Sequence, residues 1–246
     1  MKVVLLGATR GMGRALARQM AHRGDDIALL GRNGDDLRRT AQDLRVRSGG
    51  SNRVEVIHCD LEDPATFEPA LNLASEALKG LETVVVTAGL FAQQHQLEDD
   101  PVLVQRLLTV NFTNTVIFCE HARARLLATG GGTLCVFSSV AGDRGRKPVV
   151  LYGAAKAGLS AYLEGVDHKF RARGLVTVCV KPGFVRTSMT DGLSVPPFAG
   201  EPEQVAARVL EAIDRKRPVV YAPAIWGLIM EVIRRLPRFV MRRVEF

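Results

Sequence analysis

Short apolar runs alternate along the chain with longer segments in which apolar residues recur every three or four positions. The short runs are Val3–Leu6, Ile27–Leu30, Val54–His58, Thr83–Thr87, Thr133–Ser138, Val176–Lys181 and Val219–Tyr221. Several are continuously apolar, as is typical of strands covered on both faces. The segments that favour helices are Gly11–Arg23, Asp35–Arg47, Pro64–Lys79, Pro101–Ala128, Val150–Arg173 and Pro202–Lys216. The alternation predicts an α/β fold, a doubly wound parallel sheet of about seven strands with helices on both faces.

Length and composition agree with one such domain. The chain has 246 residues, of which 47% are hydrophobic and 24% charged, and no repeat or low-complexity linker divides it. We expect residues 1–223 to form a single domain that carries the chemistry and residues 224–246 to form a C-terminal helical extension. The apolar run Val3–Leu6 is too short for a signal peptide. No run approaches about 18 apolar residues, so no membrane-spanning helix is predicted.

Cysteine and histidine residues show no metal-ligand spacing. The four cysteines are Cys59, Cys119, Cys135 and Cys179, and three of them lie in or beside apolar runs. Buried, reduced thiols are therefore predicted, which is in keeping with a cytoplasmic protein. The five histidines form no cluster, so no metal site is predicted.

Nearly half of the net charge of +7 lies in the C-terminal tail. The tail opposes two glutamates with five arginines, which are Arg234, Arg235, Arg238, Arg242 and Arg243. Its apolar residues stand at helical spacing, and they are Ile225, Trp226, Ile229, Val232, Ile233 and Leu236. A basic amphipathic end predicts peripheral contact with a membrane surface, not nucleic acid binding. Packing of the same stripe on the body of the protein, or on another subunit, is an equally good interpretation.

A glycine-rich turn follows the first predicted strand. It reads Gly7-Ala-Thr-Arg-Gly11-Met-Gly13 and leads into a helix. Glycines let the backbone approach a pyrophosphate, and a helix N-terminus offers unpaired N–H groups and a positive dipole end. We therefore assign cofactor contacts to the turn, through Gly7, Thr9, Arg10, Gly11, Met12 and Gly13.

The second predicted strand ends without the acidic residue that usually grips a ribose 2′-hydroxyl. Arg32 follows it, and no carboxylate appears before Asp35. Together with Arg10, Arg32 suits a 2′-phosphate, which predicts NADP(H) as the cofactor; two solvated surface arginines are the alternative. After the third strand, Asp60 is placed to accept a hydrogen bond from adenine, or else to cap a helix ahead of Pro64.

A serine, a tyrosine and a lysine follow the fifth predicted strand in order. They are Ser139, Tyr152 and Lys156, and the last two lie on one face of a helix at i and i+4. An ammonium beside a phenol lowers the phenol's pKa, so Tyr152 is predicted to transfer a proton near neutral pH. Ser139 would hold a carbonyl or alcohol oxygen in front of it. The alternative is an ordinary surface Tyr and Lys.

These motifs, in this order, resemble the short-chain dehydrogenases/reductases over nearly the whole chain. The matching residues are Gly7, Gly11, Gly13, Asp60, Leu61, Ala88, Gly89, Asn111, Ser139, Tyr152, Lys156, Pro182, Gly183 and Thr187. The resemblance implies a Rossmann-like fold and an NADPH-dependent reduction of a ketone to a secondary alcohol. It also implies a homodimer or homotetramer formed through Pro101–Ala128 and Val150–Arg173. Two segments depart from the family pattern, Leu6 before the first glycine and the pair Val86-Thr87 before Ala88.

The resemblance also implies roles for individual residues. Tyr152 would be the general acid, Ser139 would bind the substrate oxygen, and Lys156 would lower the pKa of Tyr152 and hold the nicotinamide ribose. Asn111 would fix a water that relays protons to Lys156. The remaining implied cofactor contacts are Leu61, Ala88, Gly89, Pro182, Gly183, Val185 and Thr187.

The segment that should face the substrate, Ser188–Gly200, is small and apolar, which favours a hydrophobic or lipid-linked carbonyl compound. The tail and the stretch around Tyr152 resemble a narrower branch, typified by the ketoreductase subunit of the decaprenylphosphoryl-ribose epimerase. That resemblance implies a lipid-linked keto-sugar. A reductase of long-chain keto-lipids, such as a 3-ketosphinganine or a 3-oxoacyl thioester, is the first alternative. A non-catalytic NADP-binding sensor and a membrane-associated interaction protein are alternatives of another class.

Overall fold

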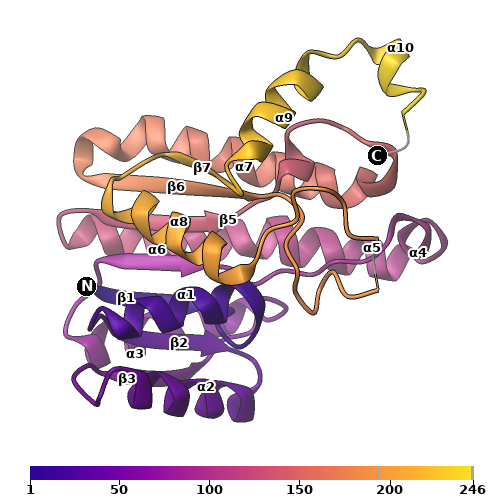
Figure 1. The fold of residues 1–246 in the computed structure, drawn as a ribbon. Helices are drawn as coiled ribbons and strands as arrows, with labels where there is room; N and C mark the ends of the chain where they lie inside the picture. Colours follow the sequence, from indigo (N-terminus) through magenta and orange to yellow (C-terminus); the bar gives the residue numbers. More distant parts are fainter. Residues whose placement is uncertain (193, 245–246) are drawn as a thin grey trace.

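A computed structural model describes residues 1–192 and 194–244 of the chain. Within these residues one parallel sheet has the strand order β3-β2-β1-β4-β5-β6-β7 (Figure 1). The strands are β1 Lys2–Leu6, β2 Asp26–Gly31, β3 Val54–His58, β4 Thr83–Val86, β5 Gly132–Phe137, β6 Leu175–Pro182 and β7 Val219–Ala222. Every predicted strand is present, with bounds that differ by at most one residue at either end. The prediction of a doubly wound parallel sheet is confirmed.

Helices cover both faces of the sheet (Figure 1). One layer consists of α1 Gly11–His22, α2 Gly34–Arg47 and α8 Pro202–Asp214, and the other of α3 Phe67–Leu78, α6 Asn114–Ala128 and α7 Val150–Phe170. Because successive side chains of a strand point to opposite faces, Leu5 packs into the first layer while Val4 and Leu6 pack into the second. This two-sided burial is the reason why the strands are continuously apolar.

The predicted helix Pro101–Ala128 is not a continuous α-helix. It divides into α5 Pro101–Leu108, a π-helical turn over Thr109–Thr113, and α6. A short helix that the sequence did not indicate, α4 Gln94–Asp99, precedes it. A π-helical turn inside a helix frequently marks a functional site, and this one contains Asn111.

The same segment is the one part of the described chain that is long and apolar enough, by length and composition, to cross a membrane. Its mean hydropathy reaches 1.3 in an 18-residue window. The core helix of a globular domain passes this test as well, so the finding is weak evidence. Phe118, Cys119 and Ala122 from this segment are fully buried in the core.

All four cysteines are buried and unpaired, as predicted. Burial raises the pKa of the Cys59 thiol to about 11, and it raises the pKa values of Cys119 and Cys135 still further. These thiols are therefore protonated near neutral pH and act as small apolar core residues.

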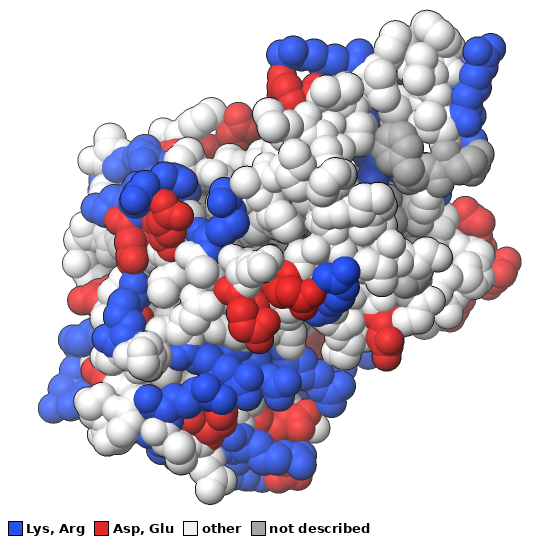
Figure 2. All heavy atoms as spheres, viewed as in Figure 1, with Lys and Arg blue, Asp and Glu red and all other residues white. Residues whose placement is uncertain are grey.

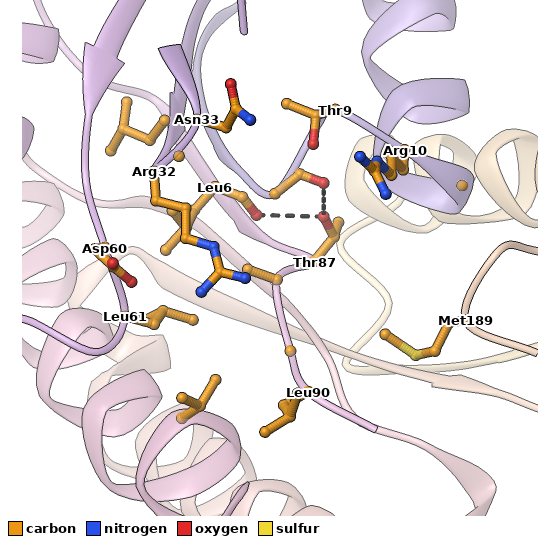
Figure 3. A pocket seen from close by; sticks show the side chains of 18 of the residues that line it. Leu6, Thr9, Arg10, Arg32, Asn33, Asp60, Leu61, Thr87, Leu90 and Met189 are labelled. Carbon is orange, nitrogen blue, oxygen red and sulfur yellow. Dashed lines mark hydrogen bonds between the residues drawn. The ribbon is translucent and has the colours of Figure 1, made fainter. Parts of the chain in front are cut away.

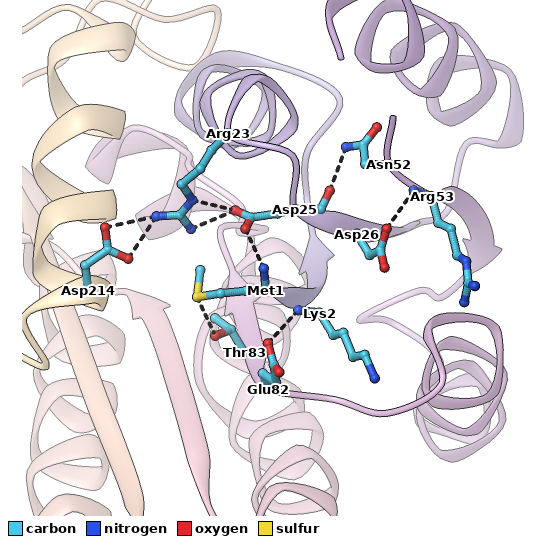
Figure 4. Close-up of polar contacts among 10 residues, drawn as sticks. All are labelled: Met1, Lys2, Arg23, Asp25, Asp26, Asn52, Arg53, Glu82, Thr83 and Asp214. Atoms are coloured by element: carbon cyan, nitrogen blue, oxygen red, sulfur yellow. Dashed lines mark hydrogen bonds and ion pairs between the residues drawn. The ribbon is translucent and has the colours of Figure 1, made fainter. Parts of the chain in front are cut away.

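At the amino-terminal ends of the strands, a buried carboxylate joins three elements (Figure 4). Asp25 accepts a hydrogen bond from the Met1 ammonium at 2.6 Å and two from the Arg23 guanidinium at 2.7 and 3.0 Å. The same guanidinium donates to both carboxylate oxygens of Asp214 on α8 at 2.9 Å. The network therefore ties the end of α1 to the start of β1 and to α8, on the side of the sheet opposite the strands' carboxyl ends.

The C-terminal segment forms α9 Ile225–Arg235 and α10 Arg238–Met241. Met230 and Ile233 of α9 are buried against Val140, next to the end of β5. Val232, which belongs to the same row of apolar residues at helical spacing, is by contrast 63% exposed. One face of the helix thus packs on the body, and a second apolar face remains at the surface.

Candidate active site

A cavity of about 660 Å³ opens at the carboxyl ends of the strands (Figure 3). It lies where β1 and β4 are neighbours in the sheet although they are not consecutive in the chain, the position at which ligands bind in open α/β sheets. The structure brings twelve of the predicted cofactor contacts to its wall. They are Gly7, Thr9, Arg10, Gly11, Met12, Gly13, Arg32, Asp60, Leu61, Ala88, Gly89 and Thr187.

The glycine turn has no room for side chains. A Cβ atom on Gly7, where φ is +101°, would lie 2.5 Å from the backbone nitrogen of Ala88. A Cβ atom on Gly13 would lie 2.3 Å from the Gly7 carbonyl oxygen. The turn is anchored by Thr87, whose hydroxyl contacts the Gly7 carbonyl at 2.8 Å and the Leu6 carbonyl at 3.3 Å (Figure 3). Thr87, which lies in one of the two segments that depart from the family pattern, therefore holds β4 to the turn.

Helix α1 begins at the cavity and presents its N-terminus there. Its N-cap Arg10 is extended and makes no side-chain cap hydrogen bond, and the first turn contains no acidic residue. The first N–H groups of the helix thus keep their hydrogen-bonding capacity, and the positive end of the helix dipole is not neutralised within the helix. Backbone, dipole and space together fit a dinucleotide pyrophosphate.

Both arginines that were predicted to bind a 2′-phosphate have carboxylate partners. Arg32 donates to Glu62 at 2.9 Å, and Arg10 donates to Asp36 over a longer 3.4 Å. In Figure 3 the Arg32 side chain turns into the cavity, whereas Arg10 lies beside the start of α1. The prediction missed both partners, which also line the cavity. Arg106 of α5 was missed too; it binds Glu62 across 44 residues of sequence, and no local signal announces such a pair.

The helix-capping interpretation of Asp60 is wrong. Asp63 caps the turn that begins at Pro64, because its carboxylate accepts a hydrogen bond from the N–H of Ala65 at 3.1 Å. Asp60 instead accepts one from the N–H of Glu62 at 3.0 Å and borders the cavity. The alternative that remains for Asp60 is a contact with adenine.

Ser139, Tyr152 and Lys156 come together at the end of β5. The Ser139 hydroxyl oxygen accepts a hydrogen bond from the N–H of Ala141 at 3.1 Å, and the hydroxyl also hydrogen-bonds to Tyr152. The buried Lys156 ammonium donates to the Phe137 carbonyl at 2.8 Å and lies 5.8 Å from the centre of the Tyr152 ring. Ser138, the neighbouring candidate, is buried and bonded to the Lys156 carbonyl. Ser139 is thus the serine that faces outward.

The expected fall in the pKa of Tyr152 is not found. Burial raises the pKa of Tyr152 to about 12, although a hydrogen bond with Ser139 acts in the opposite direction. Burial also lowers the pKa of Lys156 to about 8. The prediction considered only the attraction between the two groups, and it neglected that burial disfavours the charged form of both.

The side chain of Asn111 contacts the loop after β4, and its role in holding a water stays a prediction. Both polar atoms of its amide bind the backbone of Leu90, with the Leu90 N–H donating at 2.7 Å and the Leu90 carbonyl accepting at 2.6 Å. A Cβ atom on Gly89 would lie 3.0 Å from the Asn111 amide oxygen and 3.8 Å from the Lys156 nitrogen. The π-helical turn therefore fastens the loop after β4 beside Lys156, on the wall of the cavity.

Three predicted cofactor contacts, Pro182, Gly183 and Val185, do not line the cavity among the described residues. The indole of Trp226 covers Gly183 so closely that a Cβ atom there would lie 2.2 Å from the indole nitrogen. Val185 is 2% exposed. Tyr152 and Lys156 also lie outside the cavity lining, although Gly89 brings its wall next to Lys156.

Comparison with known proteins places the chain in a family. A family model described as short chain dehydrogenase matches residues 1–195. An uncharacterized oxidoreductase of Mycobacterium tuberculosis is 33% identical over 244 residues, which covers 98% of this chain and 96% of that protein. Carbonyl reductase family member 4 of Danio rerio is 28% identical over 215 residues, covering 84% of this chain and 88% of that protein.

Solved structures share the fold. A short-chain dehydrogenase from Sphingobium yanoikuyae in complex with NADPH has a TM-score of 0.80 and 24% identity, covering 96% of both chains. A short-chain type dehydrogenase/reductase from Mycobacterium ulcerans has a TM-score of 0.82 and 20% identity, covering 89% of this chain and 86% of that one. With the family match over most of the sequence, the chain belongs to the short-chain dehydrogenases, and it is an NAD(P)-dependent oxidoreductase of that family.

Proposed function

We propose that the protein is an NADPH-dependent carbonyl reductase with Tyr152 as its general acid. The observation that carries the proposal is the placement of Ser139, Tyr152 and Lys156 beside the wall of a cavity built from a glycine turn and the N-terminus of α1. NADPH bound in that cavity would supply the hydride.

The side chains suit proton donation near neutral pH. Because the pKa of Tyr152 is about 12, the phenol is protonated and has a proton to give to a carbonyl oxygen. The Ser139 hydroxyl would donate a hydrogen bond to the same oxygen and hold it in place. With a pKa of about 8, Lys156 is mostly an ammonium at pH 7, and its charge would stabilise the phenolate that remains after the transfer. Asn111 would act as a positioning residue for the loop beside Lys156.

The substrate that we propose is a hydrophobic or lipid-linked ketone. Apolar side chains stand at the surface of the segment after β6, with 54% of Val195 and 61% of Phe198 exposed. Trp226 of α9 donates a hydrogen bond to the Phe198 carbonyl at 3.3 Å, which joins this segment to the C-terminal helices. A lipid-linked keto-sugar and a long-chain keto-lipid both suit such a surface. The two substrates differ in the part that carries the ketone, which is a sugar in the first and the lipid chain itself in the second. Residue 193 of the segment lies outside the described residues.

The test of activity is NADPH consumption with a panel of keto-sugars, keto-lipids and steroids. Substitution Tyr152→Phe is expected to lower the rate on any active substrate at least ~10²-fold, the lower end for a general acid. The matched control is Tyr162→Phe on the same helix, since the Tyr162 hydroxyl donates to Glu120 at 2.7 Å. Retention of the wild-type rate by the Tyr152 variant would refute the assignment.

We further propose that residues 224–246 keep the protein peripheral to a membrane from the cytoplasmic side. Leu228, Val232 and Phe239 are 69%, 63% and 60% exposed. In the view of Figure 2 a largely uncharged surface extends over α9 and α10, with basic side chains at its edge. Apolar side chains beside arginines suit an anionic lipid surface.

Sedimentation with vesicles that contain anionic phospholipid tests the membrane contact. Replacing Leu228, Val232 and Phe239 together by Asp should abolish co-sedimentation. Val46→Asp, at a residue of α2 that is 76% exposed, is the matched control and should leave it unchanged. Equal binding by both variants would mean that the C-terminal helices serve packing alone.

We also propose that the protein forms a homodimer or homotetramer through the outer faces of α6 and α7. Ile117 of α6 and Phe112 of the π-helical turn before it are each 37% exposed, and the Phe112 ring lies against Gly158 of α7. Light scattering after gel filtration measures the subunit number. Ile117→Glu should shift it toward the monomer, and a wild-type monomer at micromolar concentration would refute the proposal.

A further inference from the structure

Glu62 joins two arginines at the adenosine end of the cavity. Arg106 of α5 holds both oxygens of the Glu62 carboxylate, with its Nε at 2.8 Å from Oε2 and its Nη2 at 2.7 Å from Oε1. Arg32 reaches only Oε1, through Nη1 at 2.9 Å. All three residues line the cavity, so a ligand in it meets this cluster directly.

The charge balance of the cluster depends on Arg106. A lone carboxylate next to the ribose repels a 2′-phosphate and binds a 2′-hydroxyl, which favours NAD. Here the bidentate contact with Arg106 neutralises Glu62, and that contact is the main reason why the pKa of Glu62 lies below its usual value. Two guanidinium groups against one carboxylate leave these three side chains with a net charge of +1, beside the Asp60 carboxylate, which lines the same cavity and also raises the pKa of Arg106. Without Arg106 the remaining Arg32–Glu62 pair would be neutral.

Arg32 also keeps most of its hydrogen-bonding capacity. A guanidinium has five N–H donors, and one nitrogen of Arg32 faces Glu62. The Arg32 side chain is 62% exposed and turns into the cavity (Figure 3). Its other donors can therefore meet a phosphate while the contact with Glu62 persists.

We propose that Arg106 determines the preference for a 2′-phosphorylated nucleotide, as a positioning residue that holds Glu62 and thereby leaves the charge of Arg32 to the phosphate. The proposal rests on the assignment of NADPH to this cavity. It places the choice of cofactor partly on α5, outside the glycine turn and the loop after β2.

The test compares the dissociation constants of 2′,5′-ADP and 5′-AMP by titration calorimetry, so that catalytic turnover is not needed. Arg106→Gln should weaken 2′,5′-ADP about tenfold, because Glu62, once released by Arg106, competes with the phosphate for the donors of Arg32. The affinity for 5′-AMP should stay within about twofold, since 5′-AMP lacks the second phosphate. Glu62→Gln should strengthen 2′,5′-ADP binding by a similar factor.

The double variant separates the indirect role from a direct contact. If Arg106 acts through Glu62, Arg106→Gln should have little effect on 2′,5′-ADP binding in the Glu62→Gln background. The control is Arg38→Gln, which breaks the exposed Arg38–Asp35 pair on α2, away from the cavity lining, and should change neither constant. Thermal unfolding of each variant checks that the fold is kept.

The outcomes distinguish the inference from the function on which it rests. Unchanged 2′,5′-ADP binding by Arg106→Gln, equal weakening of both nucleotides, or the same loss in the Glu62→Gln background would overturn the role of Arg106 alone. Failure of the wild-type protein to bind either nucleotide would overturn the cofactor assignment and the inference together.

Discussion

Replacement of Lys156 by Met is predicted to stabilise the protein while it removes the proposed activity. Lys156 is 5% exposed, and the described hydrogen bond of its ammonium is to a neutral backbone carbonyl, that of Phe137. Burial lowers its pKa from 10.5 to about 8. At about 1.4 kcal/mol for each pH unit, the charged side chain costs the folded state about 3 kcal/mol. Loss of the hydrogen bond costs about 1 kcal/mol, so a net gain of about 2 kcal/mol is expected at pH 7.

The gain should depend on pH in a defined direction. The unfolded chain keeps the Lys156 proton up to about pH 10.5, but the folded chain keeps it only up to about pH 8. The free-energy cost of burying the charged Lys156 side chain is therefore fully present below about pH 8. It disappears as the pH rises from about 8 to 10.5. Urea unfolding of wild type and Lys156→Met at pH 7 and at pH 10 measures the difference in unfolding free energy.

Lys181 provides the matched comparison, because it is a partly buried lysine, with 13% of its side chain exposed, that has a carboxylate partner. Its ammonium lies 2.6 Å from Asp143, whose side chain is 3% exposed and which also accepts a hydrogen bond from Tyr221 at 2.8 Å. Lys181→Met should destabilise the protein by about 3 kcal/mol, since it leaves a buried carboxylate without its counter-charge. The reasoning would be refuted if both variants lost stability at pH 7, or if the effect of Lys156→Met were the same at pH 7 and pH 10.

Three further substitutions test other parts of the structure by urea unfolding. Gly13→Ala should lower the free energy of unfolding by about 1–3 kcal/mol, because its Cβ would lie 2.3 Å from a backbone oxygen of the glycine turn. The control Gly165→Ala, in open space on α7, should instead raise it by about 0.5–1 kcal/mol. Equal effects of the two substitutions would contradict the tight packing of the turn. Asp25→Asn should cost about 1.5–3 kcal/mol, because it weakens the charge-assisted hydrogen bonds from Met1 and Arg23, while Asp214 still pairs with Arg23. A change below about 1 kcal/mol would show that the network contributes little. Met230→Ala should cost about 2–4 kcal/mol, as a fully buried side chain does, whereas a near-zero cost would mean that α9 is not docked on the body.

The arrangement of the elements followed from the sequence because burial on both faces of a strand leaves a local record. Continuous apolar runs identified the strands, and helical periodicity between them identified the crossovers. The π-helical turn at Thr109–Thr113 left no such record, since its sequence continues the helical pattern on either side. The same is true of α4, whose six residues are too few for a period to show.

At the active site, the sequence indicated the glycine turn and the serine, tyrosine and lysine, but not the residues that contact the site from distant parts of the chain. The glycines of the turn and the serine, tyrosine and lysine after β5 stand at short, regular spacings that chemistry requires. Glu62 and Arg106 meet across 44 residues, and Trp226 covers Gly183 from a helix at the other end of the chain. Such contacts depend on the path of the backbone in space, so no local pattern could indicate them.

The sequence by itself determined the parallel sheet and the glycine turn at its centre, and it supplied the candidate proton donor, because each depends on neighbours a few residues away. Only the tertiary structure decided the protonation of Tyr152 and Lys156 and the charge around Arg32. The free energy of a charge is set by how deeply the folded chain buries it and by which opposite charges the fold brings within reach.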